Sequence, residues 1–447
     1  MRVDLPDPVE FAALFAAVTG QTLERTVSGI ATDSRECRPS DLFVAIRGEQ
    51  VDGHRFLAAV DSAGSAAALV QRPDPDLSSF RQVAVADPVR TIGDIARQWR
   101  QRFTIPLIGI TGSNGKTTTK ELLSHIFSAD RSVHATRGNY NTSVGLPLTL
   151  LTLTAKHRLS ILEMGANRPG DIALLAEIAE PTHGLITNIA PAHLEGFGSI
   201  EMVARTKGEL FAALAAGTAF VNRSDERVAA LPLAGQAISF GFRPDCDYSA
   251  DLHVAPDGYI QLTINTNELD TGYNNPTFAR NTLAAVAVAD TLGLDWPTIQ
   301  ARIKTFRQPP GRCEVKQLKN ITVIDDSYNA NLVSVSAAID FLRSYHADGR
   351  HIMVFADMLE LGTESRNLHI QVGEIASAAG LDAIFTFGPA ARHTDEALTN
   401  TADHRHFDDK AILAGALKDY LRSGDVVLFK GSRGMALETI IAELREL

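Results

Sequence analysis

The sequence predicts a protein of three α/β domains, over residues 1–86, 87–312 and 313–447. A chain of 447 residues has room for about three domains of ~150 residues each. Apolar strand-like runs alternate with helix-like runs through the second and third segments, which is typical of mostly parallel sheets covered by helices. Between these two segments lies Gln308-Pro309-Pro310-Gly311-Arg312, and Pro-Pro-Gly cannot continue a helix.

The first two domains are expected to alternate short strands and helices. A strand is predicted over Asp41–Arg47, a helix over His54–Ala63, and a second helix over residues 87–103 that leads into a buried strand, Ile105–Ile110. Residues 247–270 alternate polar and apolar side chains, which indicates further strands. The other expected elements of the central domain are the strands Leu159–Glu163, Gly184–Asn188 and Ala219–Asn222 and the helices Thr117–Phe127, Asp171–Ala179 and Ile200–Ala215.

The third domain contains four apolar runs separated by helix-like segments, so we expect a Rossmann-like α/β sheet. Nothing in this segment matches the G-x-G-x-x-G pattern of dinucleotide-binding folds. The expected strands are Ile321–Ile324, His351–Phe355, Ala383–Phe387 and Val426–Phe429.

Composition argues against several classes of protein. The net charge of −11 is unfavourable for a nucleic-acid-binding surface, because phosphate backbones attract basic faces. Cys37, Cys246 and Cys313 share no metal-ligand spacing, which favours free thiols in a reducing cytoplasm. No basic-then-apolar signal opens the chain, and the apolar run Val144–Leu153 is too short to cross a bilayer. We therefore expect a soluble, cytoplasmic protein with no membrane insertion and no nucleic-acid partner.

The most informative stretch is a glycine-rich turn that follows the strand Ile105–Ile110. Residues 111–118 read Thr-Gly-Ser-Asn-Gly-Lys-Thr-Thr and lead into a helix-like segment. Glycines let backbone N–H groups close around phosphate oxygens, and the helix N-terminus adds a positive dipole end. Lys116 would reach the β- and γ-phosphates of a nucleotide, and the Thr117 hydroxyl would bind Mg²⁺. A strict G-x-x-x-x-G-K-[ST] motif would place glycine where this chain has Ile110.

Polar residues follow the predicted strands of the central domain, at the edge where ligands bind in open α/β sheets. Glu163 ends one strand and could hold Mg²⁺, although an isolated acid at a strand end is more often simply solvated. His193 follows the next strand, and it could be a ligand or a structural side chain. Lys207 lies in a predicted helix as an ordinary surface lysine, and the sequence pattern gives no reason to prefer it over Lys120.

Two polar clusters follow predicted strands of the third domain. Asp325–Asn331 reads Asp-Asp-Ser-Tyr-Asn-Ala-Asn and could bind a ribose, a hydroxyl or a metal, or could form only an acidic turn. Lys430–Gly434 reads Lys-Gly-Ser-Arg-Gly and could bind an anionic group of a substrate, or could be a solvated turn.

These motifs resemble those of the Mur ligases, which build the peptide of bacterial peptidoglycan. The family's ATP loop departs from the strict motif in the same way as residues 111–118, and the resemblance spans nearly the whole chain. It is carried by Asp33–Arg35, Asp41–Ala45 and Asp52–His54 in the first domain, by Gly138–Asn141, Glu163–Ala166 and Ala192–Phe197 in the second, and by Asp325–Asn331, Asp357–Gly362 and Lys430–Gly434 in the third.

The resemblance implies roles for the matching residues. It implies ATP and two Mg²⁺ ions, with a carbamate on Lys207, since a carbamate is an anionic oxygen ligand whereas an ammonium repels Mg²⁺. The implied catalytic residues are Lys116, His193 and Lys207, and the implied metal ligands are Thr117, Glu163, His193 and Lys207. The implied nucleotide-binding residues are Gly112, Ser113, Asn114, Gly115, Lys116, Thr117, Thr118, Asn281, Arg312 and Asp326. The implied substrate-binding residues are Ser34, Arg35, Phe43, Asn139, Asn141, Tyr328, Asn329, Asn331, Lys430, Ser432 and Arg433.

The activity implied by the resemblance is ATP-dependent amide-bond formation by a monomer. The first domain would bind UDP-N-acetylmuramoyl-tripeptide, the central domain ATP, and the third domain D-alanyl-D-alanine. ATP would phosphorylate the tripeptide carboxylate, and the dipeptide amine would attack the acyl phosphate. Two departures from the family pattern stand out. Residues 277–282 keep only Asn281 of an adenine-side His-Asn-x-x-Asn-Ala pattern, and Asn141-Thr142 replaces a pair of asparagines.

Three alternatives stay open at this point. Another muramoyl-peptide ligase or a folylpolyglutamate-type ligase would share the ATP loop, but Asp325–Asn331 and the UDP-type first domain argue against them. A P-loop switch or transport ATPase usually ends its second metal-binding strand in Asp, whereas this chain has Glu163. A non-catalytic UDP-sugar-binding protein would have no use for Lys116 and Thr117.

Overall fold

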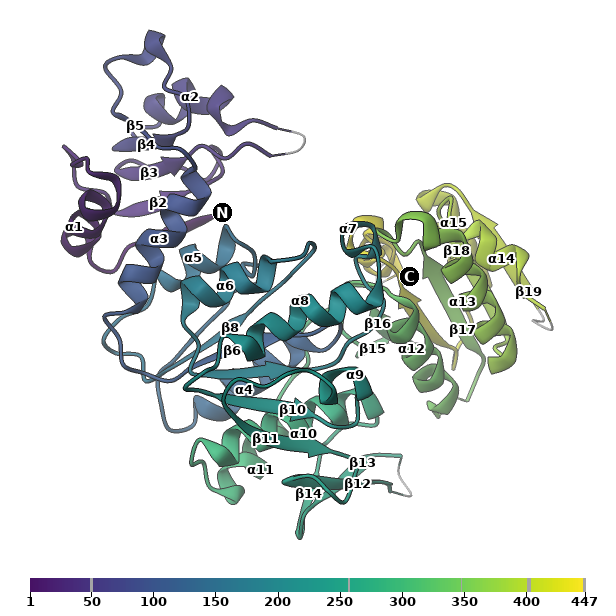
Figure 1. The fold of residues 1–447 in the computed structure, drawn as a ribbon. Coiled ribbons are helices and arrows are strands. Elements are labelled where there is room, and N and C mark those ends of the chain that lie inside the picture. Colours follow the sequence, from purple (N-terminus) through teal and green to yellow (C-terminus); the bar gives the residue numbers. More distant parts are fainter. Residues whose placement is uncertain (49–50, 256–257, 347, 400–402, 445–447) are drawn as a thin grey trace.

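The structure is a computed structural model that describes residues 1–447 except 49–50, 256–257, 347, 400–402 and 445–447. The described residues form three sheets, one in each of three lobes that follow one another along the chain (Figure 1). The predicted class, three α/β domains, is confirmed. Among the described ranges, no helix combines the length and the apolar character that a membrane span requires.

The first lobe holds a five-stranded sheet in the order β1-β2-β3-β4-β5, in which only β1 runs antiparallel to its neighbour. Buried Asp41, at the start of β3, ties this edge strand to the sheet by accepting a hydrogen bond from Arg2 Nε at 2.7 Å. The elements are β1 (Arg2–Asp4), α1 (Pro8–Thr19), β2 (Gly29–Ala31), β3 (Asp41–Val44), η1 (Gly53–Phe56), α2 (Leu57–Ser62), β4 (Ala67–Val70), η2 (Pro75–Leu77) and β5 (Gln82–Ala84).

The central lobe holds a nine-stranded sheet in the order β14-β13-β12-β11-β10-β9-β6-β8-β7. The strands from β7 to β12 are parallel, and β13 and β14 add an antiparallel extension, as the alternation over 247–270 predicts. The strands are β6 (Leu107–Thr111), β7 (Val133–Ala135), β8 (Leu159–Glu163), β9 (His183–Ile186), β10 (Thr218–Asn222), β11 (Gln236–Gly241), β12 (Tyr248–Val254), β13 (Ile260–Ile264) and β14 (Asn267–Asp270).

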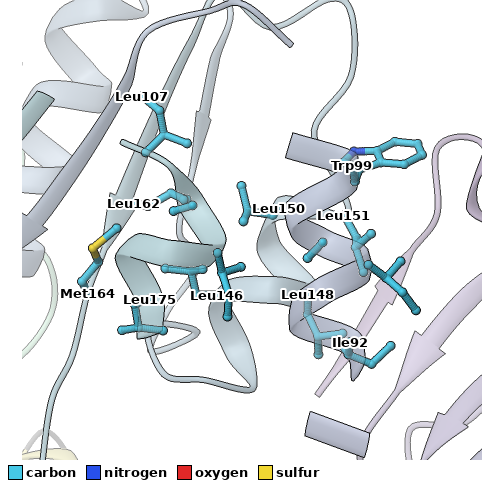
Figure 2. Packing of buried hydrophobic residues seen from close by; sticks show 14 of the residues in the cluster. Ile92, Trp99, Leu107, Leu146, Leu148, Leu150, Leu151, Leu162, Met164 and Leu175 are labelled. Carbon is cyan, nitrogen blue, oxygen red and sulfur yellow. The ribbon is translucent and has the colours of Figure 1, made fainter. Parts of the chain in front are cut away.

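Helices cover both faces of the central sheet. Side chains of β6 alternate between two apolar clusters: Leu107 packs with α3, α5, α6 and α8, whereas Ile108 packs with α4, α10 and α11. Figure 2 shows part of the first cluster, including Trp99 of α3. The Trp99 indole also donates a hydrogen bond to the Leu153 carbonyl at 3.1 Å. The helices are α3 (Pro88–Arg100), α4 (Lys116–Phe127), α5 (Gly145–Leu150), α6 (Asp171–Ala179), α7 (Leu194–Phe197), α8 (Ile200–Ala212), α9 (Glu226–Ala229), α10 (Pro276–Thr291) and α11 (Trp296–Thr305).

The third lobe holds a six-stranded sheet in the order β15-β16-β20-β17-β18-β19, parallel except for the edge strand β15. Two apolar clusters again lie on opposite faces, one with α12 and α13 and the other with α15 and α16. The elements are β15 (Glu314–Leu318), β16 (Ile321–Asp326), α12 (Leu332–Ser344), β17 (His351–Ala356), η3 (Gly362–Glu364), α13 (Ser365–Ala379), β18 (Ala383–Phe387), α14 (Arg392–Glu396), β19 (Asp403–Phe407), α15 (Lys410–Tyr420), β20 (Val426–Lys430), η4 (Arg433–Met435) and α16 (Glu438–Leu444).

Candidate active site

A cleft of about 1390 Å³ lies between the central and the C-terminal domain. Residues that follow β6, β8 and β9 line one wall, and residues that follow β16 and β20 line the other. The carboxyl ends of parallel strands meet here, which is the ligand-binding edge of open α/β sheets. All the site residues expected from the sequence line this cleft except Ser34, Arg35 and Phe43.

The expected phosphate-binding loop joins β6 to α4 and is tightly packed. Gly112 and Gly115 have φ values of 147° and 82°, which favour glycine. A Cβ at Gly115 would lie 2.5 Å from Asn281 Oδ1, and one at Gly112 would lie 1.9 Å from Thr187 Oγ1. The loop requires glycine at both positions because neither has room for a side chain.

Hydrogen bonds from the end of β9 hold the loop in place. Asn188 accepts from the backbone N–H of Ser113 at 2.9 Å through its carbonyl and from that of Asn114 at 3.0 Å through its side chain. Thr187 Oγ1 donates to the Asn114 carbonyl at 2.6 Å. Within the described residues no side chain caps α4, whose first residue is Lys116. The N–H groups of its first turn are therefore left for a ligand to bind.

Lys116 and Glu163 form the charged floor of the cleft. Lys116 Nζ donates to the Gly112 carbonyl at 2.7 Å. Burial lowers the pKa of Lys116, and the nearby Glu163 carboxylate partly opposes that shift. Glu163 is 3% exposed, and its two oxygens accept hydrogen bonds of 2.7 Å from Thr117 Oγ1 and Asn141 Nδ2. A cation would meet here a buried carboxylate beside a hydroxyl.

The structure separates the two lysines that the sequence pattern does not distinguish. Lys120 is fully buried, and its ammonium donates to the Thr136 carbonyl at 2.6 Å and to Glu121 at 2.5 Å. Lys207 is 3% exposed and lines the cleft, where its Nζ has no hydrogen bond or ion pair with any residue that the structure describes. Burial and the nearby Lys116 lower the pKa of Lys207 well below its ordinary value. Lys207 is thus a buried amine that lines the cleft, and its expected place at the surface is wrong.

His193 of the central domain contacts the C-terminal domain. It lies at the N-terminus of α7, with φ 52°, and its Nδ1 hydrogen-bonds to a Glu360 carboxylate oxygen. Burial lowers the pKa of His193, Glu360 raises it, and Lys116 and Lys207 lower it. His193 therefore lies near both Lys116 and Lys207, which line the cleft.

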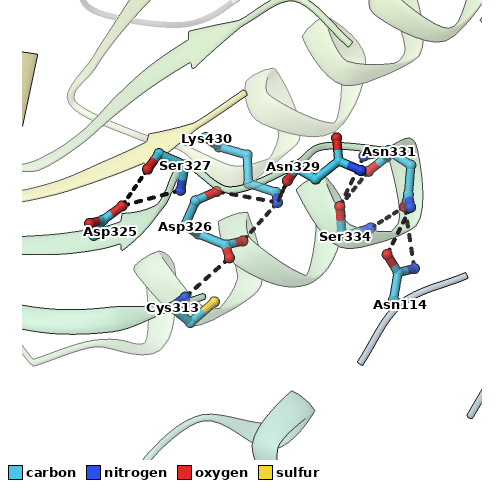
Figure 3. A network of polar contacts seen from close by, with 9 residues as sticks. All are labelled: Asn114, Cys313, Asp325, Asp326, Ser327, Asn329, Asn331, Ser334 and Lys430. Carbon is cyan, nitrogen blue, oxygen red and sulfur yellow. Dashed lines mark hydrogen bonds and ion pairs between the residues drawn. The ribbon is translucent and has the colours of Figure 1, made fainter. Parts of the chain in front are cut away.

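The cluster Asp325–Asn331 is a network rather than a loose acidic turn (Figure 3). Lys430 Nζ lies 2.8 Å from Asp326 Oδ2 and donates to the Asn329 carbonyl at 2.6 Å. Asn331 caps α12 and donates through Nδ2 to Asn114 Oδ1 at 2.7 Å, which joins the third domain to the phosphate-binding loop.

Arg312 makes a third link between the domains. Its guanidinium donates to Thr117 Oγ1 at 2.8 Å and stacks 4.0 Å from the centre of the Tyr328 ring. Arg433 approaches the same ring at 5.7 Å. Two cations therefore flank Tyr328 at the mouth of the phosphate-binding loop, where an anionic ligand would be stabilised.

The three expected substrate residues outside the cleft lie in the first domain. Arg35 is exposed and pairs with Asp33 at 2.6 Å. Phe43 is buried in an apolar cluster with Leu57 and Val60. Their roles, with that of Ser34, stay predictions. Local sequence patterns predict no role for Thr187, Asn188 or Glu360, because their importance depends on contacts between distant segments.

The donor set fits Mg²⁺ better than a softer metal. In the part of the chain that the structure describes, no group of three or more His, Cys, Asp and Glu side chains could hold a metal by itself. Glu163 and Thr117 supply hard oxygen donors, and Mg²⁺ binds through one or two carboxylates completed by phosphate oxygens and water. A bound nucleotide would supply those phosphate oxygens.

The comparisons with known proteins identify the family of this chain. Residues 110–289 match the Mur ligase middle domain, residues 311–433 the glutamate ligase domain of Mur ligases, and residues 26–100 the catalytic domain of the Mur ligase family. A relative from Synechocystis, named UDP-N-acetylmuramoyl-tripeptide--D-alanyl-D-alanine ligase, is 38% identical over 436 residues, or 96% of this chain and 94% of the relative.

Two solved structures resemble the whole chain. MurF from Acinetobacter baumannii is 30% identical, with a TM-score of 0.88 over 98% of both chains. MurF ligase from Thermotoga maritima in complex with ADP is 31% identical, with a TM-score of 0.82 over 93% of this chain and 97% of that one. Sequence identity, domain order and three-domain architecture thus agree, and this chain belongs to the Mur ligase family.

Proposed function

We propose that this protein joins D-alanyl-D-alanine to the terminal carboxylate of UDP-N-acetylmuramoyl-tripeptide, at the expense of ATP. One observation carries the proposal: the loop 111–118 faces Asp325–Asn331 and Lys430–Gly434 across one cleft. The loop suits a nucleoside triphosphate, and the two facing clusters suit an anionic, amine-bearing acceptor. Relatives named UDP-N-acetylmuramoyl-tripeptide--D-alanyl-D-alanine ligase match 95–96% of this chain.

The ATP site would be assembled from both domains. Backbone N–H groups of Gly115–Thr118 would hold the phosphates, within the loop that Gly112, Ser113 and Asn114 complete. Lys116 and Arg312 would lie on the outer oxygens of the phosphates, and Asn281 beside the loop. Among the described residues, the Lys116 ammonium donates only to the Gly112 carbonyl, so it can turn to a phosphate. The charge of that phosphate would also hold Lys116 in its protonated form. Asp326 would bind the ribose of the nucleotide.

The reaction would proceed in two steps. A carboxylate oxygen of the tripeptide attacks the γ-phosphorus, ADP leaves, and an acyl phosphate forms. The amine of D-alanyl-D-alanine then attacks the acyl carbon, the C–O bond to phosphate breaks, and the amine loses a proton as the amide forms. Positive charge around the transferring phosphoryl group and exact positioning would supply most of the catalysis.

Residues of the central domain would hold the metal that this chemistry uses. We assign Thr117 and Glu163 to one Mg²⁺, and Glu163, His193 and a carbamylated Lys207 to a second. Bound Mg²⁺ supplies positive charge to the phosphate oxygens. The lowered pKa of Lys207 supports the carbamate, because only a neutral amine adds to CO₂.

The peptide-binding and UDP-binding ends complete the proposal. Asn139 and Asn141 would contact the tripeptide, and Ser34, Arg35 and Phe43 the UDP end. Domain boundaries near residues 86 and 312 would let these parts close on the ligands. The acceptor would contact Tyr328, Asn329, Asn331, Lys430, Ser432 and Arg433.

We further propose that the protein is cytoplasmic and that it acts as a monomer. A monomer suffices because one chain supplies every proposed residue.

A panel of acceptors tests the function. Phosphate release is measured with ATP, UDP-N-acetylmuramoyl-tripeptide and, in turn, D-alanyl-D-alanine, D-alanine, diaminopimelate and D-glutamate. We expect the dipeptide to support far faster release than any single amino acid. Faster release with a single amino acid would place the enzyme at another step of peptide assembly.

A further inference from the structure

Glu360 contacts the candidate metal site from the opposite domain. It follows β17 in the C-terminal domain, and its carboxylate hydrogen-bonds to Nδ1 of His193 in the central domain. Its backbone carbonyl also accepts from the Glu195 N–H at 3.2 Å. Residues 357–362 resemble a motif of the Mur ligases, but the resemblance implies no role for Glu360.

The hydrogen bond determines which nitrogen of His193 is free. A carboxylate can only accept a hydrogen bond, so Nδ1 carries the proton. In the neutral imidazole the lone pair then lies on Nε2, which is the form that binds a metal. Metal-ligating histidines commonly donate their other ring nitrogen to a carboxylate in this way, which fixes the ring and raises its basicity.

The loop that carries Glu360 is anchored firmly enough to orient another side chain. Met358 and Leu361 are buried in the core of the C-terminal domain. The Leu359 N–H donates to Ser432 Oγ at 2.9 Å, and the Met358 N–H to His369 Nε2 at 3.1 Å. Glu360 itself has φ 61°, a conformation that persists in non-glycine residues only where the surroundings hold it.

The facing segment of the central domain is held as closely. Leu194 packs against the apolar cores of both domains. A Cβ at Gly362, which has φ 56°, would lie 3.3 Å from Glu195 Cα, so glycine permits the close approach of η3 to α7. Figure 1 shows α7 beside the C-terminal domain, away from the body of the central sheet.

We infer that Glu360 is a positioning residue that orients His193 for the metal, so that the C-terminal domain completes this site only when it has closed on the central domain. The inference rests on the proposed function, which places His193 on the metal. It adds a dependence: opening the cleft frees the imidazole to rotate and to change tautomer. The side chain of Glu360 is 56% exposed, so its hydrogen bond to His193 contributes little to folding and its variants should fold.

Mn²⁺ binding in the presence of ADP tests the inference without turnover. The EPR signal of free Mn²⁺ is followed in the wild type, Glu360→Ala, Glu360→Gln and a control, Glu364→Gln. The exposed side chain of Glu364 accepts a hydrogen bond from Asn367 and from no other described side chain. We expect ~10-fold weaker binding for Glu360→Ala. The loss should be smaller for Glu360→Gln, whose amide oxygen still accepts from Nδ1. The control should show no change, and Glu360→Ala should add nothing in a His193→Ala background.

Several results would overturn the inference. Unchanged Mn²⁺ affinity in Glu360→Ala would show that the Glu360–His193 contact only holds the two domains together and does not orient His193 for the metal. Tighter binding would make Glu360 a competitor of the metal for His193. A wild type that binds no Mn²⁺, or a Glu163→Gln variant that binds it normally, would overturn the proposed metal site and this inference together. Loss in Glu163→Gln without loss in Glu360→Ala would overturn the inference alone.

Discussion

Replacing Lys120 by methionine should destabilise the central domain although it removes a buried charge. Two effects oppose each other. Removing an ammonium from the interior ends its desolvation penalty, and such replacements can be neutral or stabilising. Against this, the Thr136 carbonyl, in a residue 2% exposed, loses its 2.6 Å donor. An unsatisfied buried acceptor costs about 1–3 kcal/mol.

The cost of the unsatisfied Thr136 carbonyl should outweigh the gain from removing the charge, because the other partner of Lys120, Glu121, is accessible to water. Glu121 is 44% exposed, so water can solvate its carboxylate at little cost. Methionine nearly preserves the volume, so no large cavity forms. We expect a loss of about 2 kcal/mol in the free energy of unfolding, or ~4–8 °C in Tm. Lys120→Ala, which adds a cavity, should lose about 4 kcal/mol.

Urea unfolding followed by circular dichroism, with m-values compared, measures the effect. The control is Lys156→Met on the surface of the same domain, which should change stability by no more than about 0.5 kcal/mol. Lys120→Met with the stability of the wild type would refute the reasoning, because the Thr136 carbonyl would then have no need of its buried donor.

Three further predictions concern the cleft and its support. Lys116→Ala should lower ligation by roughly 10²–10³-fold or more while the thermal unfolding curve stays close to that of the wild type; near-normal ligation would reject the ATP-loop assignment. Lys207→Ala should lose most activity and regain part of it with a short carboxylate in solution, whereas Lys116→Ala should not respond. Full activity of Lys207→Ala at low bicarbonate would contradict the carbamate. Burial lowers the pKa of His134 to about 4 from its ordinary 6.5, so the unfolded chain binds an extra proton between these values and stability should fall by about 3 kcal/mol as pH drops through that window. Urea unfolding at pH 7 and 4.5 should show about 2 kcal/mol of this loss in the wild type and a smaller loss in His134→Gln, and equal losses would show that another group titrates.

Much of the fold could be predicted from the sequence because long apolar runs make buried parallel strands. Leu159–Glu163 and Ala383–Phe387 are strands over those residues. The strand expected over Ile105–Ile110 is displaced to Leu107–Thr111. The sequence pattern does not predict the short strand β7 or the strands β11, β15 and β19. β7 has only three residues, and β15 and β19 are polar edge strands, where pairing rather than burial decides the conformation.

The site residues likewise include some that the sequence predicts and some that it does not. The glycines and Lys116 of the phosphate-binding loop follow from local chemistry, since a strand, a turn and a helix N-terminus are adjacent in the chain. Lys207 does not: its helix pattern is that of a surface lysine, and only packing against distant segments buries it. Glu360 reaches His193 across 167 positions, and no local pattern records such a contact.

Isotope transfer tests the central claim, an acyl phosphate formed in the cleft between the loop and the C-terminal domain. UDP-N-acetylmuramoyl-tripeptide carrying ¹⁸O in its terminal carboxylate is turned over with ATP and D-alanyl-D-alanine, and the released phosphate is analysed by mass spectrometry. The account predicts one ¹⁸O atom in each phosphate, because the carboxylate oxygen that attacks phosphorus leaves with it. Phosphate without ¹⁸O would contradict the account and indicate an ATPase that uses water, and ¹⁸O in AMP would indicate an adenylate instead.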